Sequence, residues 1–328
     1  MPAAARSRRG ARAPVRVVAL GGGHGLAASL AALRHVTEDV TAVVTVADDG
    51  GSSGRLREEF GVLPPGDLRM ALAALCHDSQ WGHLWRDVLQ HRFSGDGPLA
   101  GHSVGNLLIV ALWQLLDDPV DGLRVIGDLL GAQGRVLPMS DRPLTIEADV
   151  RDPANGVTGT VRGQKEVATT AGRVGWVRLD PTDPPANPEA VRAVLEADWV
   201  VMGPGSWFTS VCPHLLVPEL ADALQRTTAR RCVTLNLDPG TNETAGYRPE
   251  QLLEVLGAYA PGLTLDAVVA DPAAVDDVDA LAHAAGQLGA NLVMRQVSWS
   301  DGTARHHPLR LAAAYADVFA GVTADLRR

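Results

Sequence analysis

The sequence predicts an α/β protein built on a mostly parallel sheet with helices on both faces. Short runs of branched apolar residues end at glycine or polar loops, which is the pattern of strands buried on both faces of a parallel sheet. Segments with helical spacing fill the intervals, and such alternation is typical of a parallel sheet covered by helices. The expected strands are residues 15–20, 40–46, 199–202, 232–237 and 267–270, and the expected helices include residues 26–35, 104–116, 218–226, 249–259 and 278–288.

Two regions interrupt this alternation. Residues 66–131 have the spacing of successive helices without a strand, so we expect a helical excursion near the strand ends. Residues from about 135 to 180 are rich in Thr, Val and Gly and alternate in part between apolar and polar, which predicts a small β insertion. Residues 14–325 are expected to form one domain that contains both regions.

Composition and charge narrow the classes of function. The 328 residues carry a formal net charge of −9 and only 4% aromatic residues, whereas a nucleic-acid groove needs clustered Lys/Arg and stacking rings. The three cysteines are far apart and show neither a disulfide framework nor paired metal-ligand spacing. The apolar stretch 104–116 is too short to cross a bilayer, and the basic residues 1–13 lack the apolar core of a secretory signal. We therefore expect a cytoplasmic protein with a disordered tail at 1–13, no membrane span and no nucleic-acid partner.

A glycine-rich loop joins the first strand to the first helix. Glycines at this place let a phosphate approach the backbone amides at the helix N-terminus. The loop lacks the Lys-Ser/Thr of a Walker A motif, and Leu26 stands where the dinucleotide fingerprint has its third glycine, so an NAD-type dinucleotide is the weaker candidate. The alternative is a tight turn that uses glycine for positive φ. The candidate residues are Gly21, Gly22, Gly23, His24 and Gly25.

An acidic loop follows the second strand and emerges at the same edge of the sheet, where open α/β sheets bind ligands. Asp48 and Asp49 are candidates to hold a ribose hydroxyl, to orient an attacking hydroxyl or to bind Mg²⁺. The glycines and serines behind them offer amides and hydroxyls to phosphate, and an arginine supplies a cation. The alternative is a solvated turn that caps the next helix. The further candidates in this loop are Gly51, Ser52, Ser53, Gly54 and Arg55.

Other polar residues stand at element boundaries along the chain. A third glycine-rich loop follows the strand at 199–202, and three such loops at one edge strengthen the phosphate prediction. Helix capping explains Asp67 at least as well as function does, and structural roles are the alternatives for His102 and Tyr247. The candidate residues are Asp67, Arg69, His102, Asn106, Gly203, Gly205, Ser206, Asn236, Glu243, Tyr247 and Arg305.

The order of these motifs resembles the YvcK/GlmR gluconeogenesis-factor family, within the 2-phospho-L-lactate transferase (CofD)-like superfamily. The matching motifs lie at residues 21–26, 44–57, 64–69, 101–107, 203–210 and 243–247, and the resemblance covers roughly residues 15–320. It implies a Rossmann-like three-layer α/β/α fold that binds UDP-sugars, chiefly UDP-N-acetylglucosamine. It also implies a regulatory role that links carbon metabolism and gluconeogenic growth to cell-wall precursor synthesis and cell shape, through an enzyme of that synthesis as partner.

The same resemblance leaves a second function open. The transferase relatives use an Asp-Asp loop with a divalent metal, and Asp48 and Asp49 match it, so a metal-dependent 2-phospho-L-lactate transferase-like reaction is the alternative. Whether the chain catalyses a reaction, and whether it forms a homo-oligomer, are not decided by the motifs. Two departures from the family pattern are His24, where threonine is commoner, and His307, which replaces an acid.

Overall fold

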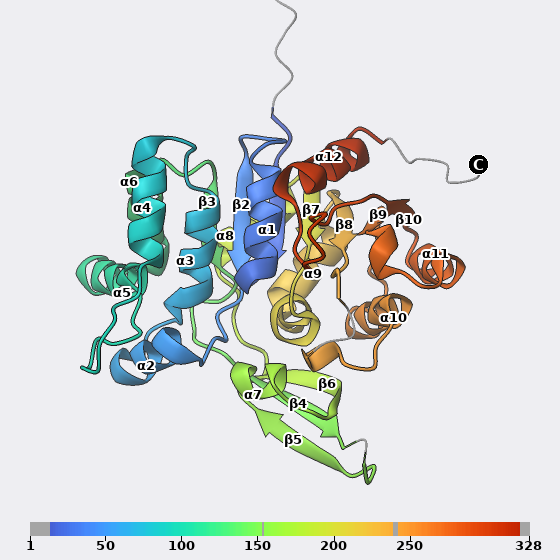
Figure 1. Ribbon diagram of the computed structural model, residues 1–328, viewed down its shortest axis with the longest axis horizontal. Coiled ribbons are helices and arrows are strands. Elements are labelled where there is room, and N and C mark those ends of the chain that lie inside the picture. Colours follow the sequence, from blue (N-terminus) through green and yellow to red (C-terminus); the bar gives the residue numbers. More distant parts are fainter. Residues whose placement is uncertain (1–13, 153, 239–241, 322–328) are drawn as a thin grey trace, which may run out of the picture.

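The large sheet has seven parallel strands in the order β10-β9-β8-β7-β1-β2-β3 (Figure 1). The computed structural model describes residues 14–152, 154–238 and 242–321, so the tail predicted at 1–13 lies outside it. The strands are β1 (Val17–Gly21), β2 (Val40–Val44), β3 (Arg135–Pro138), β7 (Trp199–Met202), β8 (Arg230–Thr234), β9 (Ala267–Ala270) and β10 (Asn291–Met294). The predicted α/β fold with a mostly parallel sheet is confirmed.

Helices cover both faces of this sheet. The helix α1 packs against α3 and α12 on the face turned toward the viewer in Figure 1, while α8 packs against α9. The helices are α1 (Gly23–Leu33), α2 (Gly51–Phe60), α3 (Pro65–Ala74), α4 (Gln80–Gln90), α5 (Val104–Leu116), α6 (Pro119–Leu130), α7 (Gln164–Ala168), α8 (Pro188–Glu196), α9 (Pro218–Arg226), α10 (Pro249–Tyr259), α11 (Val278–Gln287) and α12 (Pro308–Phe319). None of the helices in the described part of the chain has the length and apolar character needed to span a membrane.

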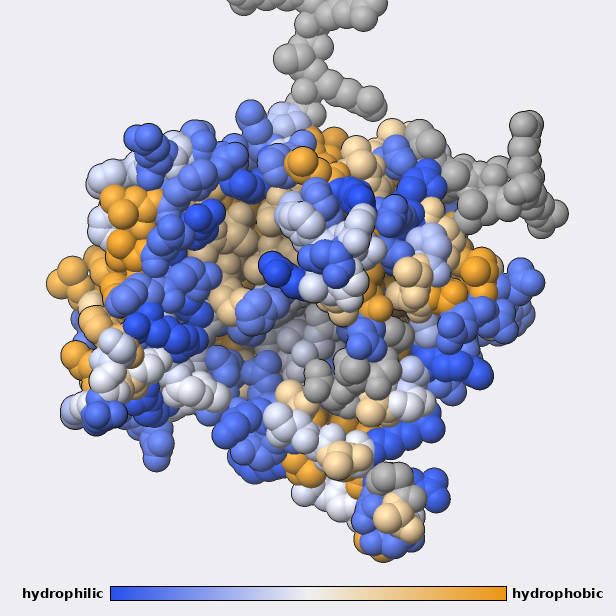
Figure 2. All heavy atoms as spheres, in the orientation of Figure 1, coloured by the Kyte–Doolittle hydropathy of each residue, from blue (hydrophilic) through white to orange (hydrophobic). Residues whose placement is uncertain are grey.

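The helical excursion is present as α3 to α6. Its outer surface carries hydrophobic side chains, which Figure 2 shows as an orange group at the left edge of the molecule. Large apolar residues of α4 and α5 are exposed: Trp81, Leu84 and Leu115 expose 56%, 57% and 76% of their surface. Large apolar side chains gathered at a surface are typical of contacts with another protein.

The β insertion is a separate three-stranded antiparallel sheet in the order β5-β4-β6. Its strands are β4 (Thr145–Arg151), β5 (Thr158–Arg162) and β6 (Arg173–Asp180), and alternate residues of β4 are buried. Tyr259 stacks on Trp176 with ring centroids 4.0 Å apart, which attaches β6 to α10.

One boundary of this insertion differs from the prediction. Residues 135–138, which we expected within the insertion, form β3 and pair with β2 at the edge of the large sheet. The reason is that Val136, Leu137 and Pro138 are consecutively buried, which suits a strand covered on both faces and not the half-buried alternation of β4.

A buried hydroxyl network joins α1, α12 and β8 below the third glycine-rich loop. Ser29 Oγ donates to the carbonyl of Gly203 at 2.8 Å. The Tyr315 hydroxyl lies 2.7 Å from Ser29 Oγ and 2.9 Å from Thr234 Oγ1. Because the single Ser29 proton goes to Gly203, Tyr315 donates to Ser29 and accepts from Thr234. The C-terminal helix therefore supports the loop at 203 through Ser29.

We predict that Tyr315→Phe destabilises the fold. The substitution leaves the fully buried Thr234 hydroxyl without its acceptor, so the free energy of unfolding should fall by about 1–2 kcal/mol. Urea unfolding followed by circular dichroism measures it, with Leu309→Ala on the exposed side of α12 as the control. Equal stability of wild type and Tyr315→Phe would contradict the network.

Candidate functional site

The large sheet extends from β1 on both sides, and the candidate site lies beyond the end of β1, at the point where the strand order reverses. β2 and β3 follow on one side of β1, while β7 to β10 extend on the other. In open α/β sheets the crevice beyond the carboxyl ends of the strands at such a point is the usual ligand site. The loops after β1, β2 and β7, which the sequence singled out, all begin at this edge.

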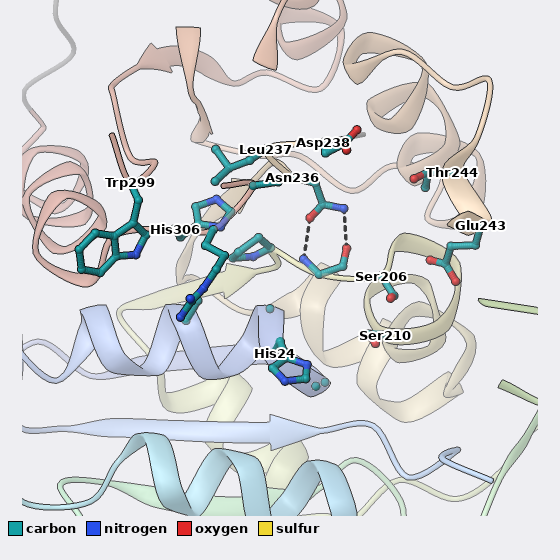
Figure 3. A pocket seen from close by; sticks show the side chains of 18 of the residues that line it. His24, Ser206, Ser210, Asn236, Leu237, Asp238, Glu243, Thr244, Trp299 and His306 are labelled. Atoms are coloured by element: carbon teal, nitrogen blue, oxygen red, sulfur yellow. Dashed lines mark hydrogen bonds between the residues drawn. The ribbon is translucent and has the colours of Figure 1, made fainter. Parts of the chain in front are cut away.

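The first and third glycine-rich loops are in direct contact. A Cβ atom on Gly25 would lie 2.2 Å from the Pro204 carbonyl oxygen, so only glycine permits this approach. Asn236, after β8, holds the third loop: its Oδ1 accepts from the Gly205 amide at 2.8 Å and its Nδ2 donates to the Gly205 carbonyl at 2.9 Å (Figure 3). The two loops therefore form one continuous rim.

A cavity of about 730 Å³ opens beside this rim. Figure 3 shows Trp299 and His306 on one side of it, Glu243 on the other and His24 at the start of α1. Its walls combine the glycine loops with the segment before α12 and a residue of the β insertion. The predicted residues on it are Gly22, Gly23, His24, Gly25, Gly205, Ser206, Asn236, Glu243 and Arg305, and the residues that the sequence analysis missed include Gln164, Ser210, Trp299 and His306.

Three buried polar atoms of this cavity have no hydrogen-bond partner among the described residues: Gln164 Oε1, Glu243 Oε2 and His306 Nε2. Burial raises the pKa of Glu243, although its Oε1 accepts from the Phe208 amide at 2.8 Å. Burial also lowers the pKa of His306 to about 4, so its imidazole is neutral near pH 7. Unsatisfied buried groups are costly and need explaining, and a polar ligand in the cavity would satisfy all three.

The acidic loop opens on a second cavity, of about 260 Å³. It is lined by polar and charged residues from the loop, from α3 and from α5, and three of its buried polar atoms also lack partners: Asp67 Oδ2, Arg69 Nε and Asn106 Oδ1. Thus six of the twelve unpartnered buried side-chain atoms in the described residues lie on the two cavities. The predicted residues on this cavity are Asp48, Gly51, Ser52, Ser53, Asp67, Arg69 and Asn106.

Asp67 connects the two cavities. It lies in the first turn of α3, and its carboxylate accepts a hydrogen bond from the Gly23 amide of the first loop. A Cβ on Gly22 would meet Asp67 Oδ2 at 2.6 Å, so the carboxylate touches the backbone of that loop. Burial, and then the nearby negative charge of Asp48, raise the pKa of Asp67 to about 7. This carboxyl group is therefore poised to exchange a proton near neutral pH.

The two adjacent aspartates of the acidic loop do not act as a pair. Asp48 Oδ1 accepts from the Gly50 amide at 2.9 Å, whereas both oxygens of Asp49 accept backbone amides at the start of α7. In the described ranges there is no group of three or more His, Cys, Asp or Glu side chains placed to hold a metal ion. The residues fit Mg²⁺ better between Asp48 and Asp67, because one or two carboxylates with substrate phosphates and water suffice for that ion.

Other predicted residues have structural partners. His102 Nδ1 lies 3.0 Å from Ser52 Oγ, which also accepts from Asn106 Nδ2, so this histidine holds the start of α2. Arg55 donates to the Pro98 and Ala100 carbonyls. Burial, and then the nearby charge of Arg55, lower the pKa of His102.

Four further predicted residues lie off both cavities, like Asp49, Arg55 and His102, and they do so for reasons of packing or backbone shape. The Tyr247 hydroxyl donates to the Val174 carbonyl at 2.6 Å and its ring packs against Phe208, so this ring belongs to the core. Gly54 gives room to the Asp49 carbonyl, which a Cβ would meet at 2.1 Å. Gly21 ends β1, and Gly203, at φ +72°, turns the chain after β7.

Of the residues missed by the sequence analysis, Gln164 and Trp299 carry no local motif, whereas Ser210 ends the motif at 203–210 and His306 follows the predicted Arg305. Trp299 and His306 come from the segment between β10 and α12, where Trp299 is 40% exposed and packs against His307 with ring centroids 4.2 Å apart. An exposed tryptophan near the Arg305-His306 pair is the signal that was available. Gln164 belongs to the β insertion, and nothing in its local sequence points to the cavity.

Fold and cavities together define a Rossmann-like α/β protein with its candidate ligand site at the topological switch point. Comparison with known proteins identifies the family within this class. The model of the family described as 2-phospho-L-lactate transferase CofD matches residues 17–293. The chain belongs to this family, and its relatives place it in the gluconeogenesis-factor branch.

Those relatives span most of the chain. A Mycobacterium tuberculosis protein that is provisionally named a gluconeogenesis factor is 54% identical over 304 residues, covering 90% of this chain and 88% of the relative. The gluconeogenesis factor of Listeria monocytogenes is 36% identical over 310 residues, covering 91% and 94%. A crystal structure of a UPF0052-family protein from Bacillus halodurans superposes with a TM-score of 0.82 at 31% identity, covering 93% of this chain and 99% of that one.

We predict that Asp67 gives the protein a distinctive pH dependence. Its folded-state pKa of about 7 lies above the unfolded value of about 4, so the native state binds the extra proton between these pH values. This contribution to the free energy of unfolding therefore falls as pH rises from 4 to 7, by an amount on the order of a few kcal/mol. Urea unfolding at pH 5 and pH 8 should show a smaller loss for Asp67→Asn than for wild type. If wild type, Asp67→Asn and the exposed control Glu58→Gln all lost the same free energy of unfolding between pH 5 and pH 8, the raised pKa of Asp67 would be contradicted.

Proposed function

We propose that the chain is a UDP-sugar-binding regulatory protein, with UDP-N-acetylglucosamine as its ligand. The observation that carries the proposal is the large cavity, in which two contacting glycine loops meet three unpartnered buried polar atoms. Its volume of about 730 Å³ suits a ligand of that size. The membership of the gluconeogenesis-factor branch supports a role in gluconeogenic growth. We further propose that the chain is a cytoplasmic regulator that links carbon metabolism to cell-wall precursor synthesis and cell shape, with an enzyme of that synthesis as partner.

The walls of the cavity favour particular parts of such a ligand. The glycine loops and the N-terminus of α1 suit the diphosphate, and Arg305 supplies a guanidinium that can bind two phosphate oxygens. Trp299 offers an exposed ring for stacking on the uracil. The unpartnered atoms of Gln164 and Glu243 accept hydrogen bonds, which suits the hydroxyl and amide groups of the sugar.

Binding of this ligand is the first test. Isothermal titration calorimetry should give saturable heat with UDP-N-acetylglucosamine. Arg305→Ala should weaken the affinity by about 10- to 100-fold, because a charged hydrogen bond to phosphate is lost, while Arg226→Ala on the exposed side of α9 should leave it unchanged. The same titration with NAD addresses the dinucleotide alternative. No heat and no thermal shift at saturating sugar nucleotide would refute the proposal.

A second candidate function is a metal-dependent transfer like that of 2-phospho-L-lactate transferase. The observation that favours it is the pair Asp48 and Asp67 on the small cavity, where Asp67 has an unpartnered oxygen and a pKa of about 7. These carboxylates would hold Mg²⁺, which would neutralise phosphate charge at the site. Their neighbours Arg69 and Arg92 would orient the phosphate oxygens.

The two functions make different predictions for catalysis. If the chain is a transferase, Mg²⁺, a nucleotide-activated lactate and a deazaflavin acceptor should yield product, and Asp67→Asn should lower kcat by at least about 100-fold. The exposed Glu58→Gln variant is the control. No product across a series of divalent metals, together with retained binding of UDP-N-acetylglucosamine, would exclude the transferase and keep the regulator.

A further inference from the structure

We propose that Asp49 is a positioning residue, which docks the β insertion onto the acidic loop and thereby places the Gln164 side chain on the wall of the large cavity. The motif alone suggested a metal ligand at Asp49. The inference rests on the proposed function in one respect, namely that this cavity binds a nucleotide sugar. It adds that the sugar-bearing end of the ligand is recognised by the β insertion.

The contact between Asp49 and α7 is bidentate. Asp49 Oδ2 accepts from the Gln164 amide at 3.1 Å, and Oδ1 accepts from the Lys165 amide at 3.0 Å. Amides in the first turn of a helix have no partner within the helix, and a carboxylate satisfies them and suits the helix dipole. The residue at the N-cap, Gly163, has no side chain to do this. The cap of α7 therefore comes from a loop more than a hundred residues away in the chain.

Gly163 makes the close approach possible. Its φ of +106° is a conformation that other residues rarely adopt. A Cβ at this position would also lie 2.4 Å from Asp49 Oδ2 and 2.7 Å from Glu166 Oε2. An alanine at 163 would push α7 away from Asp49 without altering the carboxylate itself.

The docked helix brings one polar side chain to the ligand cavity. Gln164 lines the cavity and its Oε1 is buried without a partner in the described part of the chain. A carboxamide oxygen repels phosphate oxygens and attracts hydroxyl and N–H donors. The helix also lies against η3 (Asn242–Thr244), which carries Glu243, and Figure 3 shows Glu243 on the side of the cavity opposite Trp299. Gln164 therefore faces the sugar and not the base.

Hydrogen exchange in the metal-free full chain tests the docking directly. The amides of Gln164 and Lys165 should exchange at least about tenfold faster in Asp49→Asn and in Gly163→Ala than in wild type. In both variants these amides lose the Asp49 carboxylate as their hydrogen-bond acceptor. Gly159→Ala, in the same insertion, is the matched control, since a Cβ there would meet no atom within 4 Å. A metal ligand with no docking role would leave exchange in metal-free Asp49→Asn unchanged, and that result would overturn the inference.

Calorimetry with two probes tests the consequence for recognition. Gln164→Ala should weaken binding of UDP-N-acetylglucosamine by about tenfold and leave binding of UDP unchanged, and Asp49→Asn and Gly163→Ala should do the same. The double variant Gly163→Ala/Gln164→Ala should bind no more weakly than either single variant, because both remove one interaction. The inference would be overturned if the double variant bound the nucleotide sugar more weakly than either single variant. It would also be overturned if the affinity for UDP fell by the same factor as the affinity for UDP-N-acetylglucosamine. If wild type binds neither probe, the proposed function fails, while hydrogen exchange still decides the role of Asp49.

Discussion

The contact between the first and third glycine-rich loops is the constraint on which the rest of the site depends. β1 and β7 are neighbours at the point where the strand order reverses, so their following loops must share one small space. Gly25 allows the two backbones to approach more closely than a side chain would permit, since its Cβ would lie 2.3 Å from the Gly205 Cα. Once that rim is in place, the large cavity lies beside it and the Asp67 carboxylate lies against Gly23 beneath it. Strand order thus determines where the candidate site lies.

Much of the fold was predictable because the signals are local. Branched runs ended by glycine or polar residues predicted β1, β2, β7, β8 and β9, since a buried parallel strand needs little context. β10 was missed because Asn291–Met294 is only four residues long and begins with a polar residue at the edge of the sheet. β3 was assigned to the insertion because its sequence does not show which sheet it joins.

The site was predictable where residues stand at the end of a strand or the start of a helix. The glycine loops and Asn236 follow strands, Asp67 lies in the first turn of α3, and the structure brings them to the two cavities. Gln164, Trp299 and His306 were not found. Each lies in a segment that only the tertiary fold brings back to the cavity, and its local sequence does not predict that contact. Tyr247 shows the converse: its motif suggested a ligand, but its hydroxyl is bonded to β6 and its ring packs in the core. Asp49 likewise follows a ligand motif while its carboxylate binds a helix of the β insertion.

The span of the large cavity along the chain has a consequence for biosynthesis. Its lining begins at Gly22 and ends at Pro308, and the network under the third loop needs Tyr315. A nascent chain therefore exposes its glycine loops on the ribosome long before the segment with Trp299 and Arg305 exists to cover them. The lining of the cavity is complete only when Pro308, at the start of α12, has been made. The candidate ligand cavity is accordingly one of the last features that a newly synthesised molecule completes.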